Sequence, residues 1–187
     1  EEILPQLKKE IEGKLSNLPA EVSGVVLRRR TYFLGKWMRH GGIYPTKLLR
    51  IFRRGKGVSE EREMDEHIIL KEGEKTIFEN DFIDNNLNPL GVWLAKHKNY
   101  ARREATAHLR EKSSGNGAGE SRNKKNDFYY SLPPFLRALA YFVYRYFVRL
   151  GFLDGLTGLK FHFLQGFWYR LLVDINIYKL EKQADNG

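Results

Sequence analysis

Two carboxylates and an imidazole stand side by side at Asp65, Glu66 and His67, just before an apolar run that ends at Leu70. A carboxylate can serve as a general base that takes a proton from an attacking hydroxyl group. Neighbouring residues of an extended segment point to opposite sides, so only one of these two carboxylates can face a substrate. Three consecutive residues cannot readily converge on one metal ion, so no metal site is expected here. The alternative is a solvated, charged turn that leads into a strand.

The chain has 187 residues, a formal net charge of +9 and no cysteine. Its length allows one domain with a sizeable core. The charge calls for a partner of opposite sign, such as anionic lipid, a phosphorylated substrate or nucleic acid. No nucleic-acid-binding motif and no broad basic surface with interleaved aromatic residues is evident, so nucleic acid is not expected as a partner. The lack of cysteine excludes disulfides and thiolate metal sites.

The periodicity of apolar residues predicts the elements that position these groups. Isoleucine and leucine residues three and four positions apart predict an amphipathic helix over Glu1–Leu18. Runs of β-branched and apolar residues predict strands over Val22–Tyr32, Lys47–Gly57 and Thr76–Phe82. Asparagine residues followed by Pro89 predict the start of a further helix.

The C-terminal stretch Phe128–Leu180 is dense in aromatic residues and leucine. Charged residues interrupt it well short of the ~20 apolar residues that a membrane span needs, so no span is predicted. Basic residues recur in it at multiples of four, opposite an apolar side, at Arg137, Arg145 and Arg149. This pattern favours helices that lie on an anionic membrane surface, with a break at 151–158. The alternative is a pair of ordinary helices that close a protein core.

Four stretches carry a shared pattern: RTYFLGKWMRHGG (30–42), YPTKLLRIFRRGKG (44–57), EMDEHIIL (63–70) and NDFIDNNLNPLGVWLAKHKNYARREA (80–105). Together, and more loosely with the C-terminal run, they resemble the second half of a bacterial family 2 glycosyltransferase. Members of this family are inverting, nucleotide-sugar-dependent enzymes of the GT-A fold that build cell-surface polysaccharides. The resemblance covers most of the chain except its Ser/Gly/Asn-rich insert.

The resemblance implies an α/β fold, namely the acceptor half of a GT-A domain with a few-stranded mixed sheet and helices, followed by a helical, amphipathic C-terminal element. The expected regions are the acceptor-side half (1–112), a flexible polar linker (113–127) and a membrane-docking region (128–187). The donor-binding half and its acidic DAD-type motif are expected to be missing from this chain. A divalent cation, Mg or Mn, is therefore expected only in the full-length enzyme, and this chain alone is expected to be inactive.

The resemblance also implies that a sugar passes, with inversion, from a nucleotide-sugar donor to a glycan or lipid-linked acceptor. It makes Glu66 the expected general base, Asp65 the second candidate, and His67 an orienting or acceptor-binding group. The further substrate-binding candidates are Arg39, His40, Arg50, Arg53, Arg54, Trp93, Lys96, His97 and Tyr100. Three of these, Arg50, Arg53 and Arg54, would face the donor diphosphate. Lys98 departs from the family pattern, in which asparagine is common.

These roles have purely structural alternatives. Trp93 and Tyr100 could be packing residues, and the basic strand predicted over Lys47–Gly57 could be a solvated or lipid-facing edge strand. The resemblance to a glycosyltransferase implies a peripheral protein at the cytoplasmic face of the inner membrane. The alternative function is a non-enzymatic, basic, amphipathic protein that binds anionic membrane surfaces.

Overall fold

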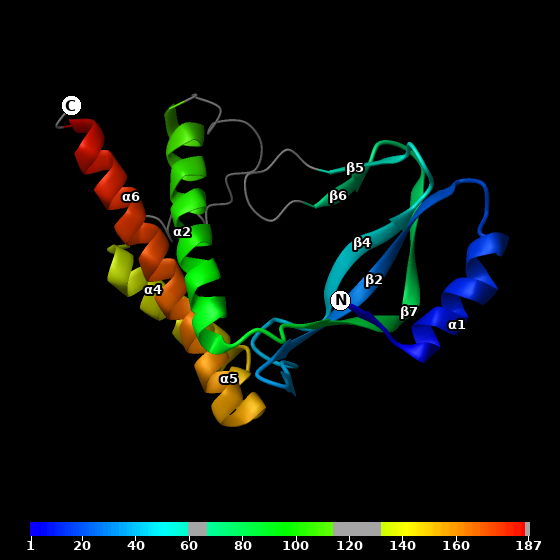
Figure 1. Cartoon of the computed structure of the whole chain (residues 1–187), viewed down its shortest axis with the longest axis horizontal. Coiled ribbons are helices and arrows are strands. Elements are labelled where there is room, and N and C mark those ends of the chain that lie inside the picture. Colours follow the sequence, from blue (N-terminus) through cyan, green and yellow to red (C-terminus); the bar gives the residue numbers. More distant parts are fainter. Residues whose placement is uncertain (60–66, 114–131, 186–187) are drawn as a thin grey trace. The chain divides into compact units, whose positions relative to one another are not determined.

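The computed structural model describes residues 1–59, 67–113 and 132–185. It divides into two compact units, Glu1–Leu87 and Asn88–Gly187 (Figure 1). The first unit contains the strands and one helix, and the second unit is helical. The predicted α/β class, with a mixed sheet and helices, is confirmed at this level.

The boundary between the units lies before the long helix α2 (Leu90–Ser113). The sequence grouped this helix with the strands, in the region 1–112, whereas its contacts lie mainly with the C-terminal helix α6 (Tyr169–Asp185). Helix α2 begins just after Pro89, as predicted.

The first unit is built on a five-stranded sheet, in the order β1, β7, β2, β3, with β4 also paired to β2. Its strands are β1 (Glu2–Ile3), β2 (Val22–Phe33), β3 (Lys36–Trp37), β4 (Thr46–Phe52) and β7 (Glu74–Asn85). Strands β2 and β7 run parallel and the other pairs are antiparallel, so the sheet is mixed. A separate antiparallel pair joins β5 (Gly57–Ser59) and β6 (Ile68–Leu70).

Helix α1 (Pro5–Lys14), which continues into the short turn η1 (Leu15–Asn17), covers one face of this sheet. Its fully buried Leu7 packs in a core with Val25 and Leu27 of β2 and two phenylalanines of β7. Because side chains alternate along a strand, Arg28 and Arg30 of β2 lie on the opposite face. The predicted helix therefore exists, but Glu2–Ile3 is a strand instead of its first turn, because it pairs with the edge of β7 before Pro5 begins the helix.

The second unit is a set of helices and helical turns in which α2 and α6 lie side by side (Figure 1). The remaining elements are α4 (Pro134–Val143), η3 (Tyr144–Val148), η4 (Gly151–Asp154), α5 (Gly155–His162) and η5 (Phe163–Trp168). The chain turns at Leu150, whose φ of 59° is left-handed, and at Gly155, whose φ is 67°. The break predicted at 151–158 is shorter than expected, because regular helix resumes at Gly155. Among the described helices, none combines the length and the apolar character needed to cross a bilayer.

Candidate functional site

The predicted catalytic carboxylates, Asp65 and Glu66, lie outside the described residues. His67, the orienting candidate, is described and exposed, and it immediately precedes β6. The described members of the predicted site are therefore His67 and the basic and aromatic candidates.

A group of charged and aromatic side chains gathers on the face of the sheet opposite α1. We call it the Asp81 cluster, and its members are Arg28, Arg30, Trp37, Arg39, Tyr44 and Asp81. They come from β2, β3, the loop before β4, and β7. Only Arg39 of these residues was among the predicted substrate-binding candidates.

The Asp81 carboxylate is the centre of the cluster and is almost fully buried. It accepts hydrogen bonds from Arg28 Nε at 2.9 Å, Arg30 Nε at 2.7 Å and the Tyr44 hydroxyl at 2.9 Å. Such charge-assisted bonds are the strong ones in proteins. Burial and the hydrogen bond to Asp81 raise the pKa of the Tyr44 hydroxyl, which therefore stays a neutral donor at physiological pH.

The indole of Trp37 forms the second anchor of the cluster. The guanidinium carbons of Arg30 and Arg39 lie 4.6 Å and 4.7 Å from its ring centroid, within the range of cation–π attraction. Tyr44 packs against the same indole edge-on, with centroids 5.2 Å apart. Trp37 Nε1 is buried and has no hydrogen-bond partner among the described residues.

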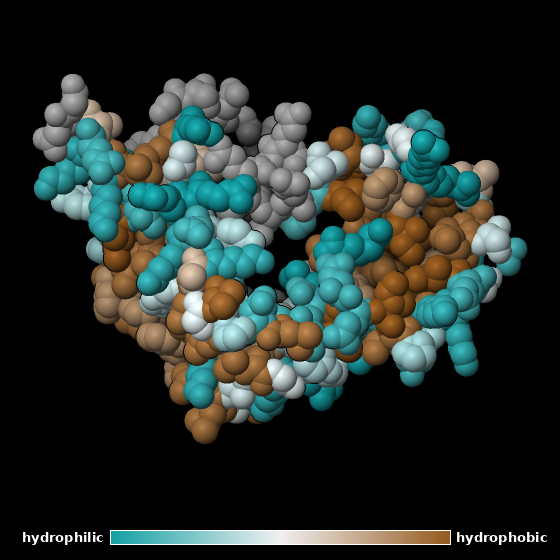
Figure 2. All heavy atoms as spheres, viewed as in Figure 1, coloured by the Kyte–Doolittle hydropathy of each residue, from teal (hydrophilic) through white to brown (hydrophobic). Residues whose placement is uncertain are grey.

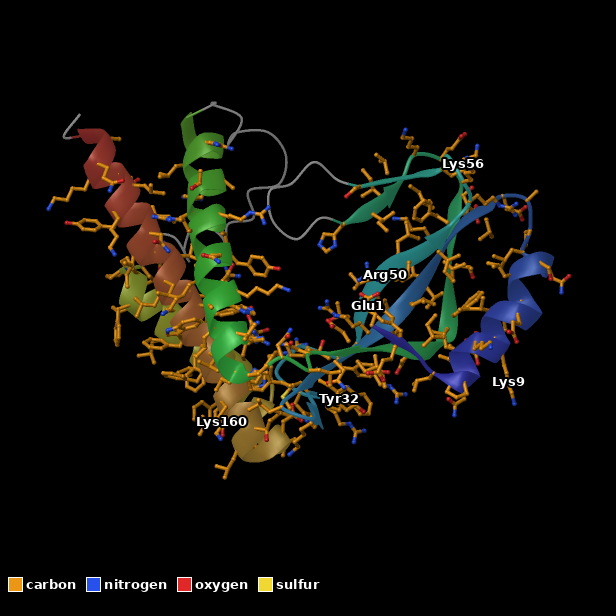
Figure 3. All side chains as sticks on the ribbon, in the orientation of Figure 1. Glu1, Lys9, Tyr32, Arg50, Lys56 and Lys160 are labelled. Carbon is orange, nitrogen blue, oxygen red and sulfur yellow. The ribbon has the colours of Figure 1, made fainter. Side chains whose placement is uncertain are left out.

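The three arginines predicted to face a diphosphate have separate surroundings. Arg50 donates to the Glu1 carboxylate at 2.6 Å, and Figure 3 shows the two side chains together. Arg53 donates to the backbone carbonyls of Val22 at 2.8 Å and Pro19 at 3.1 Å, where it secures the start of β2. Arg54 is exposed in the turn before β5. None of the contacts described for these three joins them to one another, whereas Arg39 enters the Asp81 cluster and His40 follows it in a half-buried position.

The aromatic candidates of α2 pack within the second unit. Trp93 is buried and stacks on His97, with ring centroids 3.6 Å apart. The ring centroid of Trp168 lies 6.5 Å from that of Trp93. His97 Nδ1 is 2.8 Å from the Trp93 carbonyl and therefore donates, so its Nε2 accepts from the Gln165 amide at 3.1 Å. Burial lowers the pKa of His97, which agrees with this neutral form.

The remaining candidates on α2 belong to the same helical packing. Lys96 lies over the Tyr100 ring at 5.4 Å. One turn further on, Glu104 accepts from the Tyr169 hydroxyl at 2.6 Å and from Arg170 at 3.0 Å, which ties α2 to α6. These contacts match the packing alternative given for Trp93 and Tyr100, and substrate binding by this group stays a prediction.

Five of the six members of the Asp81 cluster were not among the predicted substrate-binding candidates. Arg28 and Arg30 are two positions apart in a predicted strand, which was a signal that they share a face. The position of Asp81 gave no such signal, because it lies 53 and 51 residues from the two arginines.

The described residues contain no group of three or more His, Asp or Glu side chains that could hold a metal ion. In comparisons with known proteins, no family model matches the chain and no solved structure matches it.

Proposed function

We propose that the chain is the acceptor-side half of an inverting family 2 glycosyltransferase. The resemblance of four sequence stretches to that family motivates the proposal, and one spatial observation supports it. Three of those stretches, 30–42, 44–57 and 80–105, each contribute to the Asp81 cluster. Segments that serve one reaction are expected to gather around one site, although they are far apart in the sequence.

In the proposed reaction the acceptor hydroxyl attacks the anomeric carbon of a nucleotide-sugar. A carboxylate, Glu66, takes the hydroxyl proton while the new carbon–oxygen bond forms. The bond to the diphosphate breaks on the opposite side, and the nucleoside diphosphate leaves with the bonding electron pair, so the configuration inverts. A divalent cation would supply charge stabilisation for the leaving diphosphate in the full-length enzyme. This chain alone is proposed to be inactive.

Replacing Glu66 with glutamine in a version that includes the donor-binding half is expected to lower kcat by about 10²–10⁴-fold, because the proton acceptor is lost. Transfer is measured as nucleoside diphosphate release. The matched variant Asp65→Asn is expected to retain most of the activity. If only Asp65→Asn abolished transfer, the base would be Asp65, and if neither variant did, the proposed reaction would be wrong.

We further propose that the second unit docks on an anionic membrane surface, either as part of this enzyme or as the function of a non-enzymatic protein. The observation in favour is a separation of charge. Between residues 132 and 180 the acidic side chains are Asp154 and Asp174, and both are buried. Of the cations of the same stretch, Arg149 and Lys160 are exposed, and Lys160 is labelled in Figure 3. Arg137 and Arg145, which were predicted to lie on the same basic face as Arg149, are instead buried.

Large apolar side chains are exposed in the same stretch. Leu156 is 79% exposed and Leu153 is 55% exposed, beside Phe147, Val148 and Phe152. Figure 2 shows hydrophobic residues gathered over α4 and α5. A surface that offers cations and apolar groups, and keeps its anions buried, suits the interface of an anionic bilayer.

Changing Leu153 and Leu156 together to serine is expected to weaken binding to vesicles of phosphatidylcholine and phosphatidylglycerol by about tenfold or more, because two apolar side chains no longer enter the lipid. Vesicle cosedimentation measures the effect. The matched control is Leu87→Ser, since Leu87 is 81% exposed in the first unit. Unchanged binding of the double variant, or equal loss in the control, would contradict membrane docking, and Glu66→Gln should leave binding unaffected in either case.

A further inference from the structure

We propose that the Asp81 cluster is a binding site for a phosphate group. The proposal rests on the proposed glycosyl transfer only for the identity of the molecule that carries the phosphate. Binding itself depends on the cluster alone, all of whose members lie in the first unit.

The cluster fixes two guanidinium groups and leaves their outer edges available. Asp81 holds Arg28 and Arg30 through Nε, so the hydrogen bonds to this carboxylate do not use the terminal amino groups. The Asp81 side chain is 2% exposed, whereas those of Arg28 and Arg30 are 33% and 32% exposed. A ligand from solvent therefore meets the arginines and not the carboxylate. Terminal amino groups of arginine bind phosphate oxygens in pairs.

Trp37 orders Arg30 further and also contacts Arg39. Arg30 is held on one side by Asp81 and on another by the Trp37 ring, and Arg39 lies against that ring as well. A free arginine side chain has many rotamers, and freezing them opposes binding. Two anchors on Arg30 mean that most of this ordering is complete before a ligand arrives.

The charge and the donors of the cluster select the class of ligand. Arg28 and Arg30 contribute +2 and Asp81 contributes −1, so these three side chains carry a net charge of +1, and Tyr44 is neutral. The two guanidinium edges present more N–H donors than the two oxygens of a carboxylate use, whereas a phosphate monoester, which is anionic near pH 7, offers three acceptor oxygens. The cluster therefore suits a phosphate better than it suits a carboxylate.

The test uses the indole N–H signal of Trp37 in two-dimensional NMR of the full chain, titrated with inorganic phosphate at constant ionic strength. The chain has three tryptophans, so Trp93 and Trp168 of the second unit serve as internal references and Trp37→Phe assigns the signal. The expected result is a saturable shift of the Trp37 signal alone. Arg30→Gln is expected to raise the Kd by about tenfold or more, because one fork of donors is lost.

Two further variants keep the test decisive. Arg39→Gln removes a cation that stacks on Trp37, so it tests the site even if Arg30→Gln unfolds, with an expected rise in Kd of about threefold or more. Lys9→Gln removes one charge from an exposed position of α1 (Figure 3) and is expected to leave the Kd for phosphate unchanged. A linear, non-saturating shift, or an equal effect of Lys9→Gln, would overturn the proposal.

Two additional probes identify the source of the phosphate. Tighter binding of glucose 6-phosphate than of inorganic phosphate supports a phosphorylated sugar acceptor, and tighter binding of uridine diphosphate supports the donor diphosphate. These titrations do not require transfer. If the phosphate site does not exist, no phosphate binding is observed. If the proposed reaction is wrong, transfer survives the replacement of both Glu66 and Asp65.

Discussion

Replacing Asp174 with alanine is expected to lower the free energy of unfolding of the second unit by about 3–5 kcal/mol. Asp174 of α6 accepts from Arg137 Nε of α4 at 2.8 Å, and Arg137 Nη2 donates to its other oxygen. The two side chains are only 10% and 7% exposed. Removing the carboxylate leaves a buried guanidinium without its counter-charge, which is the costly part of the change. Urea unfolding followed by far-UV circular dichroism measures the effect.

A double replacement separates the charge from the packing. Arg137→Met combined with Asp174→Leu removes both charges and keeps the apolar volume, so it is expected to recover most of the lost stability. Lys179→Ala, at an exposed position of the same helix, is the control and should change the unfolding free energy by less than about 0.5 kcal/mol. If the double variant is as unstable as Asp174→Ala, the cost comes from the shape of the site and not from the unpaired charge.

The elements that the sequence predicted well are those with strong local periodicity. Leu7 and Ile11 of α1, one turn apart, define the apolar face of a helix, and both pack at the core of the first unit. Val25 and Leu27 lie two positions apart in a predicted strand, so they share a face, and both are buried. Pro89 sits just ahead of α2, as its preference for a helix start suggests.

The features that the sequence did not reveal depend on pairing between distant segments. Strand β1 is only Glu2–Ile3, and it exists because β7 offers an open edge more than 75 residues later. Asp81 bonds to arginines of β2 because β2 and β7 are parallel neighbours, with Arg28 opposite Asp81. No local pattern distinguishes this parallel pairing from another arrangement of the same strands.

The candidate site shows the same limit at the level of single residues. Helical spacing brought Trp93, His97 and Tyr100 onto neighbouring faces, but spacing cannot distinguish a face that meets a ligand from one that meets another helix. In the structure Trp93 and His97 contact Trp168 and Gln165, both of which come from the C-terminal helices, and substrate binding by this face stays a prediction. Arg50 was likewise predicted to face a diphosphate because of its charge. In the structure it donates to Glu1, which lies 49 residues away in the sequence.

The stability of the first unit is expected to fall as the pH drops below about 4.5, because of the Glu10 carboxylate. Burial by itself would raise the pKa of Glu10. The backbone N–H groups of Glu79 and Asn80, the Asn80 amide and Lys14 all donate to it and outweigh burial, which lowers the pKa from 4.5 to about 2. A carboxyl with a lowered folded-state pKa stabilises the fold above its unfolded-state pKa and loses that contribution as the pH falls toward 2.

Replacing Glu10 with glutamine is therefore expected to lower the free energy of unfolding by about 2–3 kcal/mol at pH 7, since the lowered pKa corresponds to roughly 3 kcal/mol. The difference from the unmodified protein should shrink steadily between about pH 4.5 and pH 2. Glu12→Gln, at an exposed position of the same helix, is the control and should cost less than about 0.5 kcal/mol at every pH. A Glu10→Gln difference that stays the same from pH 7 to pH 2 would mean that the shape of the side chain, and not its charge, joins α1 to β7.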